Sequence, residues 1–340
     1  MADEGYLEDW SREGFNGDKA WIRRAHYAPE FISAKGPHAP RRLNIADVQA
    51  QNTANPLDMP VVVATTKTGV RLAVSRRSES MPYVMRNVEC DEIHFIQQGN
   101  VRVRTGYGTF DASPGDLVCI PRSVAYQFVL LQSSALSFVV ECPAALRLRD
   151  PNGPGTVDPA RDVFYPELET APPHGRETTL ILKSTDDVTQ FLMPEDPLLA
   201  IERGGGINPV WKVRVADIKP KSEGPPTPFL GTAGNDLLVF ALSSSDRAHR
   251  PPVHVNADYD EVIYYVAGPG AWGGVSEPGT LTWVPKGVTH NGPPENVPEG
   301  YTAWLLESRA TFRLTPAALA VAELMETGLY GRHRGVVTAS

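Results

Sequence analysis

Short runs of β-branched, aromatic and aliphatic residues recur along most of this chain, and turn-forming residues separate them. In the first half the runs include PVVVAT, VRLAV, EIHFIQ, VRVRT, DLVCIP, YQFVLL and LSFVVE, and in the second half DLLVFALS, DEVIYYVAG, GTLTWVP and TAWLLES. The 31 prolines and 29 glycines divide the chain into many such short segments. This density of short strands and turns predicts an all-β fold, either a barrel or a sandwich.

The two sets of strands are separated by a long stretch that is rich in proline, glycine and charge, as in RDPNGPGTVDPARD and KPKSEGPPTP. Because a structureless loop of this length is unusual inside one domain, we expect an interdomain segment with a few elements of its own. The predicted parts are an N-terminal arm (1–60), a first β unit (61–145), the interdomain segment (146–230), a second β unit (231–314), and a C-terminal helix and tail (315–340). The arm could wrap a barrel or a partner subunit.

One helix is well marked near the end of the sequence, in TPAALAVAELMETGLYG. Thr315 can cap its first turn, and Pro316 stands where proline suits a helix start. Gly328 is a natural stop. The apolar stripe between them comes from Leu319, Ala322, Leu324 and Met325. We therefore predict a C-terminal helix that docks on the second β unit.

The composition is that of a globular protein and narrows the choice of partners. Apolar residues are 41% and charged residues 21%, and the net charge of −8 disfavours nucleic acid and anionic membranes. The first residues, MADEGYLEDWSREGF, do not resemble a signal peptide, and no run approaches the ~18 apolar residues of a membrane span. Cys90, Cys119 and Cys142 match no zinc motif and fit buried, reduced thiols. We expect a cytoplasmic protein with neither nucleic acid nor membrane as a partner.

One segment of the sequence is repeated, with substitutions. MRNVECDEIHFIQQG (85–99) and HVNADYDEVIYYVAG (254–268) carry Asn, Asp, Glu and Gly in the same slots. GDLVCIPRSVAY (115–126) aligns in the same way with GTLTWVPKGVTH (279–290). Because two matched blocks recur in the same order, the two β units are interpreted as two copies of one unit.

The second copy holds a set of side chains that suit a metal ion. His254 and Asn256 are two residues apart on a predicted strand, so they point the same way. Glu261 follows a short turn on the next strand, and His290 follows a Pro-x-Gly turn that can aim its ring back into the barrel. Two imidazoles and one carboxylate form a facial triad, which leaves open positions on iron(II) for a substrate and for O2. Manganese, nickel or zinc could take the same donors.

The first copy lacks most of these metal-binding side chains. Met85 and Tyr126 stand in the places of the two histidines, and only Glu92 remains of the three ligands. One carboxylate without imidazoles hardly holds a transition metal. The first unit is therefore predicted to be a scaffold and the second to carry the site, with His94 as a structural side chain.

The second copy reads H-x-N-x4-E-x6-G over residues 254–268 and G-x5-P-x-G-x2-H-N over residues 279–291, and these two motifs resemble those of the cupin barrel. Two such barrels with ligands only in the second resemble the homogentisate dioxygenase superfamily, which includes the large subunit of two-subunit hydroquinone 1,2-dioxygenases. The likeness covers roughly residues 60–145 and 235–330. It implies two double-stranded β-helix (jelly-roll) barrels, and a metal site of His254, Glu261 and His290 in which Asn256 also reaches the iron.

The resemblance implies an iron(II)-dependent, extradiol-type ring-cleaving 1,2-dioxygenase. Its partners would be O2 and a small aromatic substrate with two hydroxyls in para positions, of the hydroquinone or homogentisate type. The spacing from His254 to Glu261 is one residue longer than the H-x5-E common in homogentisate dioxygenases, so the ring substituent stays open. Fold analogy implies a homo-oligomer, with or without a smaller second subunit.

Two further side chains are candidate catalytic residues. The imidazole of His249 suits the removal of a hydroxyl proton, and Tyr265 can line the pocket beside Glu261. A surface histidine and a barrel-core tyrosine are the alternatives, and the neighbouring Arg250 could pair with a substrate carboxylate or be solvated. Two other functions stay open: a metal-dependent isomerase or epimerase that uses no O2, and a small-molecule-binding protein without catalysis.

Overall fold

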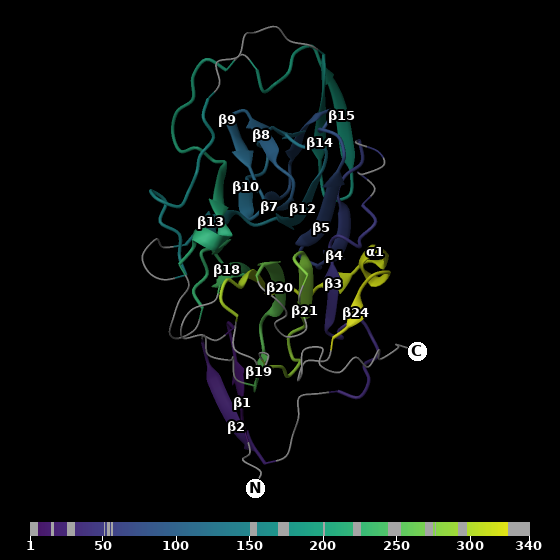
Figure 1. Ribbon diagram of the computed structural model, residues 1–340, viewed down its shortest axis with the longest axis vertical. Helices are drawn as coiled ribbons and strands as arrows, with labels where there is room; N and C mark the ends of the chain where they lie inside the picture. The colour runs from purple at the N-terminus through teal and green to yellow at the C-terminus, as the bar shows by residue number, and fades with distance from the viewer. Residues whose placement is uncertain are drawn as a thin grey trace. The chain divides into compact units, whose positions relative to one another are not determined.

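The structure is a computed structural model of the 340-residue chain. It describes residues 6–14, 17–25, 31–50, 52, 55, 57–149, 155–168, 177–199, 201–219, 226–243, 253–268, 275, 277–291 and 298–325. Almost all of their regular structure is β-strand, which confirms the predicted all-β class (Figure 1). The chain divides into two compact units. The first barrel consists of Val48–Leu146 and Asp158–Asp217, and the second of Met1–Asp47, Arg147–Val157 and Ile218–Ser340.

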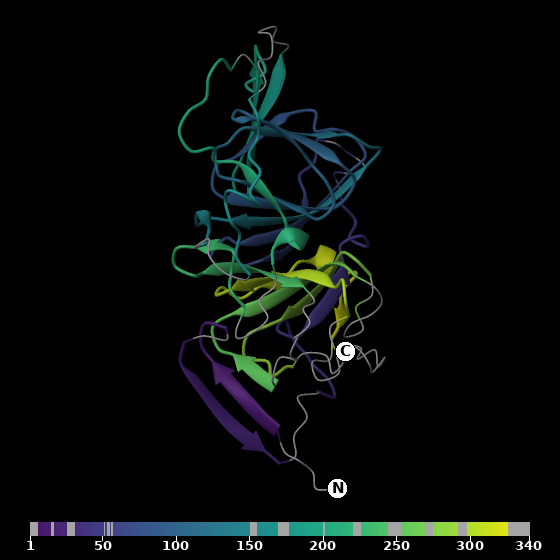
Figure 2. The same ribbon diagram turned by 60° about the vertical axis from the view of Figure 1, so that its left-hand side comes forward.

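The first barrel is built from two facing sheets, visible in Figure 2. One sheet contains, in order across it, β16 (Trp211–Arg214), β10 (Asp116–Ile120), β7 (Asp91–Gln98), β12 (Ala135–Cys142), β5 (Arg71–Arg77) and β4 (Val61–Thr65). The other contains β15 (Val188–Met193), β14 (Thr178–Lys183), β6 (Val84–Asn87), β11 (Tyr126–Leu130), β8 (Val101–Thr105) and β9 (Gly108–Ala112). From β5 to β12 the chain passes back and forth between these sheets, as in a jelly roll.

Apolar side chains from both sheets fill the first barrel. They include Tyr83, Met85, Ile96, Val101, Val103, Val118, Tyr126 and Phe128. Alternate residues of a strand point to the same face, which explains why Val101 and Val103 are buried while Arg102 between them is exposed. The three cysteines are buried, as expected.

The second barrel repeats this plan. Its large sheet contains β13 (Leu146–Leu148), β17 (Leu230–Thr232), β18 (Leu237–Ser243), β22 (Thr302–Ser308), β20 (Asp260–Ala267), β21 (Thr280–Val284), β3 (Arg41–Asn44) and β24 (Glu323–Leu324). A smaller sheet contains β19 (Val253–Asn256), β1 (Tyr6–Ser11) and β2 (Lys19–Arg24). The strands β18, β19, β20, β21 and β22 occupy the places of β5, β6, β7, β10 and β12, which accords with the two-barrel fold predicted from the repeat.

The N-terminal residues form strands that pair with strands of the second barrel. β1 pairs in parallel with β19, with Asp9 opposite His254 and Ser11 opposite Asn256 (Figures 1 and 2). β3 pairs with β21, with Leu43 opposite Leu281. The predicted boundary at residue 60 therefore differs from the observed division, which passes between Asp47 and Val48.

The predicted interdomain segment is shared between the units. Its middle part, Asp158–Asp217, belongs to the first barrel and supplies β14, β15, β16 and the 3-10 turn η2 (Val215–Asp217), whereas its two ends belong to the second barrel. The segment thus contains strands of its own, as expected. These strands, β14, β15 and β16, are part of the two sheets of the first barrel.

The C-terminal helix begins as predicted and ends early. Thr315 caps α1 (Pro316–Leu319) by accepting a hydrogen bond from the backbone N of Ala318. The helix has one turn because the chain then extends into β24, where Leu324 pairs with Arg41 of β3. The predicted stop, Gly328, lies outside the described residues. Among the residues described, no helix has the length and hydropathy of a membrane span.

Candidate metal centre

The three side chains predicted as metal ligands lie together in the second barrel. One donor atom each of His254, Glu261 and His290 lies within 4.8 Å of the other two, and all three residues are buried. Nε2 of His290 is 3.1 Å from Oε2 of Glu261, and Nε2 of His254 is 3.9 Å from Oε1 of the same carboxylate. Within the described part of the chain, no other group of histidine, cysteine and acidic side chains has this geometry.

Local backbone pairing positions the two histidines. The N–H of His254 donates to the carbonyl of His290 at 2.8 Å, and the N–H of His290 donates back at 3.0 Å. The ring centroids are 4.1 Å apart as a result. The predicted Pro-x-Gly turn leads into this bridge: Gly287 has φ of 80°, which favours glycine, and its N–H donates to the carbonyl of Asn256.

A backbone carbonyl orients the ring of His290. Nδ1 of His290 is 2.9 Å from the carbonyl oxygen of Val288. This contact favours a ring orientation in which Nδ1–H donates to the carbonyl, so Nε2 is the nitrogen that faces Glu261 and would bind a metal once it has lost its proton. Metal-bound histidines usually have such a partner on the other ring nitrogen.

Asn256 fits the ligand set in two ways. Its side-chain Nδ2 donates to Oε1 of Glu261 at 2.6 Å, which fixes the carboxylate. Its Oδ1 is buried and has no hydrogen-bond partner among the described residues. A buried amide oxygen without a partner costs free energy, so this atom suits a bound cation or a donor from a ligand.

The pKa values of Glu261 and His290 each depend on the charge of the other side chain. Burial alone would raise the pKa of Glu261, but the charge of His290 and hydrogen bonds from His254 and His290 hold this pKa well below its ordinary value. Burial lowers the pKa of His290, yet the charge of Glu261 and its hydrogen bond outweigh burial, so the pKa of His290 is raised. The carboxylate is thus ionised, and His290 is the side chain that must release a proton when a metal binds.

Sequence reasoning missed a second buried carboxyl group, Glu307. It lies in β22 directly opposite Glu261, and burial, followed by the charge of Glu261, raises the pKa of Glu307 to about 8. A third repeated block could have identified it, because LSFVVEC (136–142) aligns with TAWLLES (302–308). That alignment places Glu141 at the position of Glu307, and Glu141 lies opposite Glu92 in the first barrel.

Glu307 also lines a cavity in the second barrel with a volume of ≈ 280 Å³. The wall combines charged and apolar side chains: Glu13, Arg149, Pro226, Thr227, Pro228, Asn235, Leu238, Phe240 and Tyr259. Tyr259 precedes Glu261 by two residues, so the cavity adjoins the strand that bears the carboxylate ligand. A cavity of roughly 150 Å³ suffices for benzene, which leaves room here for a substituted ring.

Of the other predicted site residues, the structure describes Tyr265. Tyr265 is buried, its hydroxyl donates to the carbonyl of Gly268 at 3.0 Å, and its ring stacks on Tyr301 with centroids 5.2 Å apart. These contacts suit a barrel-core tyrosine, and a catalytic role for Tyr265 stays a prediction. His249 and Arg250 lie outside the described residues.

The first barrel keeps the framework of the site without its imidazoles. Met85 pairs with Tyr126 in the sheet, as His254 pairs with His290. Tyr126 donates from its hydroxyl to Oε2 of Glu92 at 2.6 Å, and Asn87 donates to Oε1 at 2.9 Å. His94 is 3.2 Å from Oε2, and its charge and hydrogen bond lower the pKa of Glu92 to about 2 although burial alone would raise it.

Comparison with known proteins gives sequence relatives for about half of the chain. A family model described as "Homogentisate 1,2-dioxygenase N-terminal" matches residues 51–192. A protein of Saccharolobus solfataricus named as a dioxygenase is 25% identical over 199 residues, covering 54% of this chain and 51% of that protein. The homogentisate 1,2-dioxygenase of Bradyrhizobium diazoefficiens is 26% identical over 202 residues, covering 53% and 45%. The chain thus spans about half the length of the curated relatives it matches.

Solved structures that resemble the chain include a cupin 2 conserved barrel domain protein from Leptotrichia buccalis. It has a TM-score of 0.40 and 10% identity, and the match covers 79% of this chain and 99% of that one. An oxalate decarboxylase from Bacillus subtilis has a TM-score of 0.39 and 11% identity, with 83% and 78% covered.

Proposed function

For this homogentisate dioxygenase-like cupin protein, we propose an iron(II)-dependent dioxygenase that opens the aromatic ring of a para-dihydroxylated substrate with O2. The observation that carries the proposal is the buried cluster of His254, Glu261 and His290. The similarity of the chain to proteins named as dioxygenases also supports the proposal. The ring would be of the hydroquinone or homogentisate type, and cleavage would be of the extradiol type.

The donor set fits a divalent transition metal. Two imidazoles and one carboxylate are the ligands of non-haem iron oxygenases, and Asn256 Oδ1 is available as a fourth donor. Iron, when bound, would polarise a ring hydroxyl and pass charge between the ring and O2. The donors also accept manganese, nickel or zinc, so the choice of iron rests on the resemblance to dioxygenases.

The residues around the ligands would hold them ready for the metal. The carbonyl of Val288 fixes the ring orientation of His290, and Nδ2 of Asn256 fixes one oxygen of Glu261. Because the low pKa of Glu261 keeps it ionised, the carboxylate is available to a cation at neutral pH. Such preorganisation is what a metal site needs from its neighbours.

The adjoining cavity would receive the aromatic ring. Phe240 and Leu238 supply apolar contacts and exclude water, and both pack in one cluster with Tyr259 and Leu305. Arg149 lines the same cavity, and because its Nη2 donates to the carbonyl of Thr232 and to Oδ1 of Asn235, its charge rather than a paired hydrogen bond would attract a carboxylate on the ring. This arginine favours a homogentisate-type acid over unsubstituted hydroquinone. His249 stays a proposed acceptor of the hydroxyl proton, and a homo-oligomer, with or without a smaller second subunit, stays a proposal from fold analogy.

Oxygen uptake by the iron-loaded protein tests the proposal. Homogentisate, gentisate and hydroquinone would each be supplied, and at least one is expected to consume one O2 per ring opened. His290→Ala should abolish this uptake, while Arg102→Met on the exposed surface of the first barrel should leave it unchanged. If no ring consumes O2 while a sugar or keto acid is converted, a metal-dependent isomerase or epimerase replaces the dioxygenase.

A further inference from the structure

The two barrels share a two-stranded ribbon beside the strand that bears the repeated asparagine. β1 runs parallel to β19 with Ser11 opposite Asn256, and β14 runs parallel to β6 with Lys183 opposite Asn87. In both places the residue after the asparagine donates its backbone N–H to the carbonyl of the opposing residue at 2.9 Å. Because the two asparagines align in the repeat, Ser11 and Lys183 occupy equivalent positions in the two barrels.

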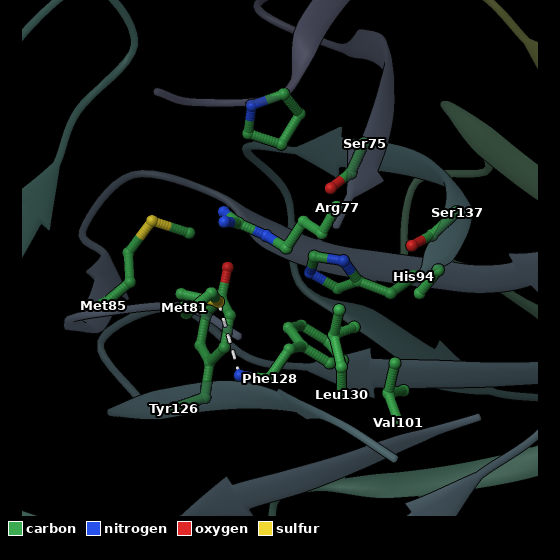
Figure 3. Close-up of a pocket in the computed structure, with 12 residues that line it drawn as sticks. Ser75, Arg77, Met81, Met85, His94, Val101, Tyr126, Phe128, Leu130 and Ser137 are labelled. Carbon is green, nitrogen blue, oxygen red and sulfur yellow. Dashed lines mark hydrogen bonds between the residues drawn. The ribbon is translucent and has the colours of Figure 1, made fainter. Parts of the chain in front are cut away.

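In the first barrel, side chains fill the interior. Lys183 is buried and forms an ion pair with Glu141, the residue that aligns with Glu307. Around Met85 and Tyr126, which align with the two histidines, the side chains leave a cavity of only ≈ 20 Å³ (Figure 3). That is the room of about one water molecule, so an aromatic ring does not fit there.

In the second barrel, the corresponding ribbon brings small residues to the same place. Ser11 is 3% exposed, and its hydroxyl donates to the carbonyl of Gly14. Gly14 has φ of 66°, and a Cβ on it would lie 2.8 Å from Oε1 and 3.0 Å from Oε2 of Glu307. The Glu307 carboxyl thus lies against Gly14, in space that a side chain would take. The lysine that meets the aligned carboxyl in the first barrel is replaced here by a serine.

The turn that contains Gly14 is also part of the cavity wall. Glu13 and Glu307 both line the cavity of ≈ 280 Å³. Arg12 holds the turn in place, because its Nε and Nη2 donate to the two carboxylate oxygens of Asp258 at 3.2 and 3.0 Å. Asp258 lies between β19 and β20, the strands that bear the first two predicted ligands. The turn therefore has a fixed position beside the metal centre.

We propose that Ser11 and Gly14 are specificity-determining residues of the ring-binding site. Their small size leaves the space beside Glu307 open for an aromatic ring, whereas Lys183 occupies the equivalent space in the first barrel. The inference rests on the proposed function, because it takes this cavity as the ring site. It assigns one wall of that site to the N-terminal turn.

The substitution Ser11→Lys, which gives the second barrel the lysine of the first, tests the inference. The ammonium should pair with Glu307 and fill the cavity beside it. Calorimetry of the metal-free protein without oxygen measures the binding of phenol and homogentisate. We expect both affinities to fall by about tenfold or more. The melting temperature should stay at or above that of the parent, because the buried carboxyl gains a cation.

A second variant, Gly14→Ala, adds a single methyl group, which should push the Glu307 carboxyl into the cavity and weaken ring binding severalfold. The matched control is Gly206→Ala, because Gly206 also has a positive φ, of 80°, but nothing lies within 4 Å of its added Cβ. Its backbone strain is similar, and ring binding should not change. In a protein that already carries Glu307→Ala, the change Gly14→Ala should leave the affinity unaltered, since the contact is gone.

The inference is overturned if a folded Ser11→Lys protein binds rings with the parent affinity. It is equally overturned if Gly14→Ala weakens binding no more than Gly206→Ala does, or by the same factor with and without Glu307. Absence of ring binding by the parent would also overturn it, because the cavity would then not be the ring site. Failure of the proposed dioxygenase has another signature: the iron-loaded parent consumes no O2 with any ring, although the rings still bind.

Discussion

Glu307 lies directly opposite Glu261 on the neighbouring strand, so two buried carboxyl groups are paired at the candidate metal centre. The first barrel repeats this pair as Glu92 and Glu141, and there Lys183 forms an ion pair with Glu141. Among the described residues of the second barrel, Glu307 has no salt-bridge partner of this kind. A divalent cation on Glu261 would supply the compensating positive charge, which is a physical reason to expect a metal in the second barrel alone.

Metal binding should weaken as the pH falls. His290 has a raised pKa because of Glu261, and it must lose a proton before Nε2 can bind a metal. The logarithm of the affinity for zinc(II) or iron(II) should therefore fall by about one for each pH unit below the pKa of His290. Calorimetry at several pH values measures this slope, and an affinity independent of pH would contradict the assignment of His290.

The substitution Glu307→Gln should stabilise the metal-free protein at high pH. The folded-state pKa of Glu307 is about 8, above its ordinary value, so its contribution to stability is lost as the pH rises through that range. The variant should exceed the parent by on the order of a few kcal/mol at about pH 9 and by much less at about pH 5. Urea denaturation at both pH values gives the difference, and an equal change at both would refute it.

Asn256→Ala should weaken metal binding by about tenfold to a hundredfold, because it removes a donor and frees one oxygen of Glu261. The matched control is Asn87→Ala, which removes the equivalent hydrogen bond to Glu92 in the first barrel. Competition with a chromogenic chelator measures both affinities. An equal loss in the two variants would show that the effect is one of general stability.

Arg149→Met should raise the KM for ring substrates that carry a carboxylate, by about tenfold or more, and leave the KM for hydroquinone nearly unchanged. The reason is that the arginine lies in the wall of the cavity that Glu307 and Tyr259 also line, and its charge attracts only a substrate that carries a carboxylate. Steady-state oxygen uptake with the two classes of substrate separates the effects. A similar rise for both classes would argue for a structural role.

Lys183→Met should destabilise the protein by about 3–5 kcal/mol, since it leaves Glu141 buried without its cation. The double variant Lys183→Met with Glu141→Leu should recover most of the loss, because no buried charge is then left unpaired. Chemical denaturation measures both. A double variant as unstable as the single one would show that packing, not charge, explains the effect.

The repeated blocks were sufficient to predict the two barrels and the meeting of His254, Glu261 and His290. Each block carries its own local signals: the alternation within strands and the Pro-x-Gly turn before His290. Glu307 was missed because its block shares little with the corresponding block of the first copy beyond the glutamate itself.

The features that sequence reasoning did not place depend on long-range pairing. β1 finds its partner about 245 residues away, with Asp9 opposite His254, and no local pattern reveals such a partner. The predicted helix fails after one turn for the same reason, because β24 pairs with β3 and this contact overrides the helical propensity of the segment.

The pairing of β1 with β19 also matters to anyone who shortens or tags the amino terminus. The strand that bears His254 and Asn256 has four residues, and each of them has a partner in Glu8–Ser11. Deleting residues 1–24 would expose the edge of β19 and release the backbone that supports two of the donors. A protein prepared in this way would bind a metal ion more weakly although every ligand residue was intact, and the loss would be easily mistaken for a defect in the ligands themselves.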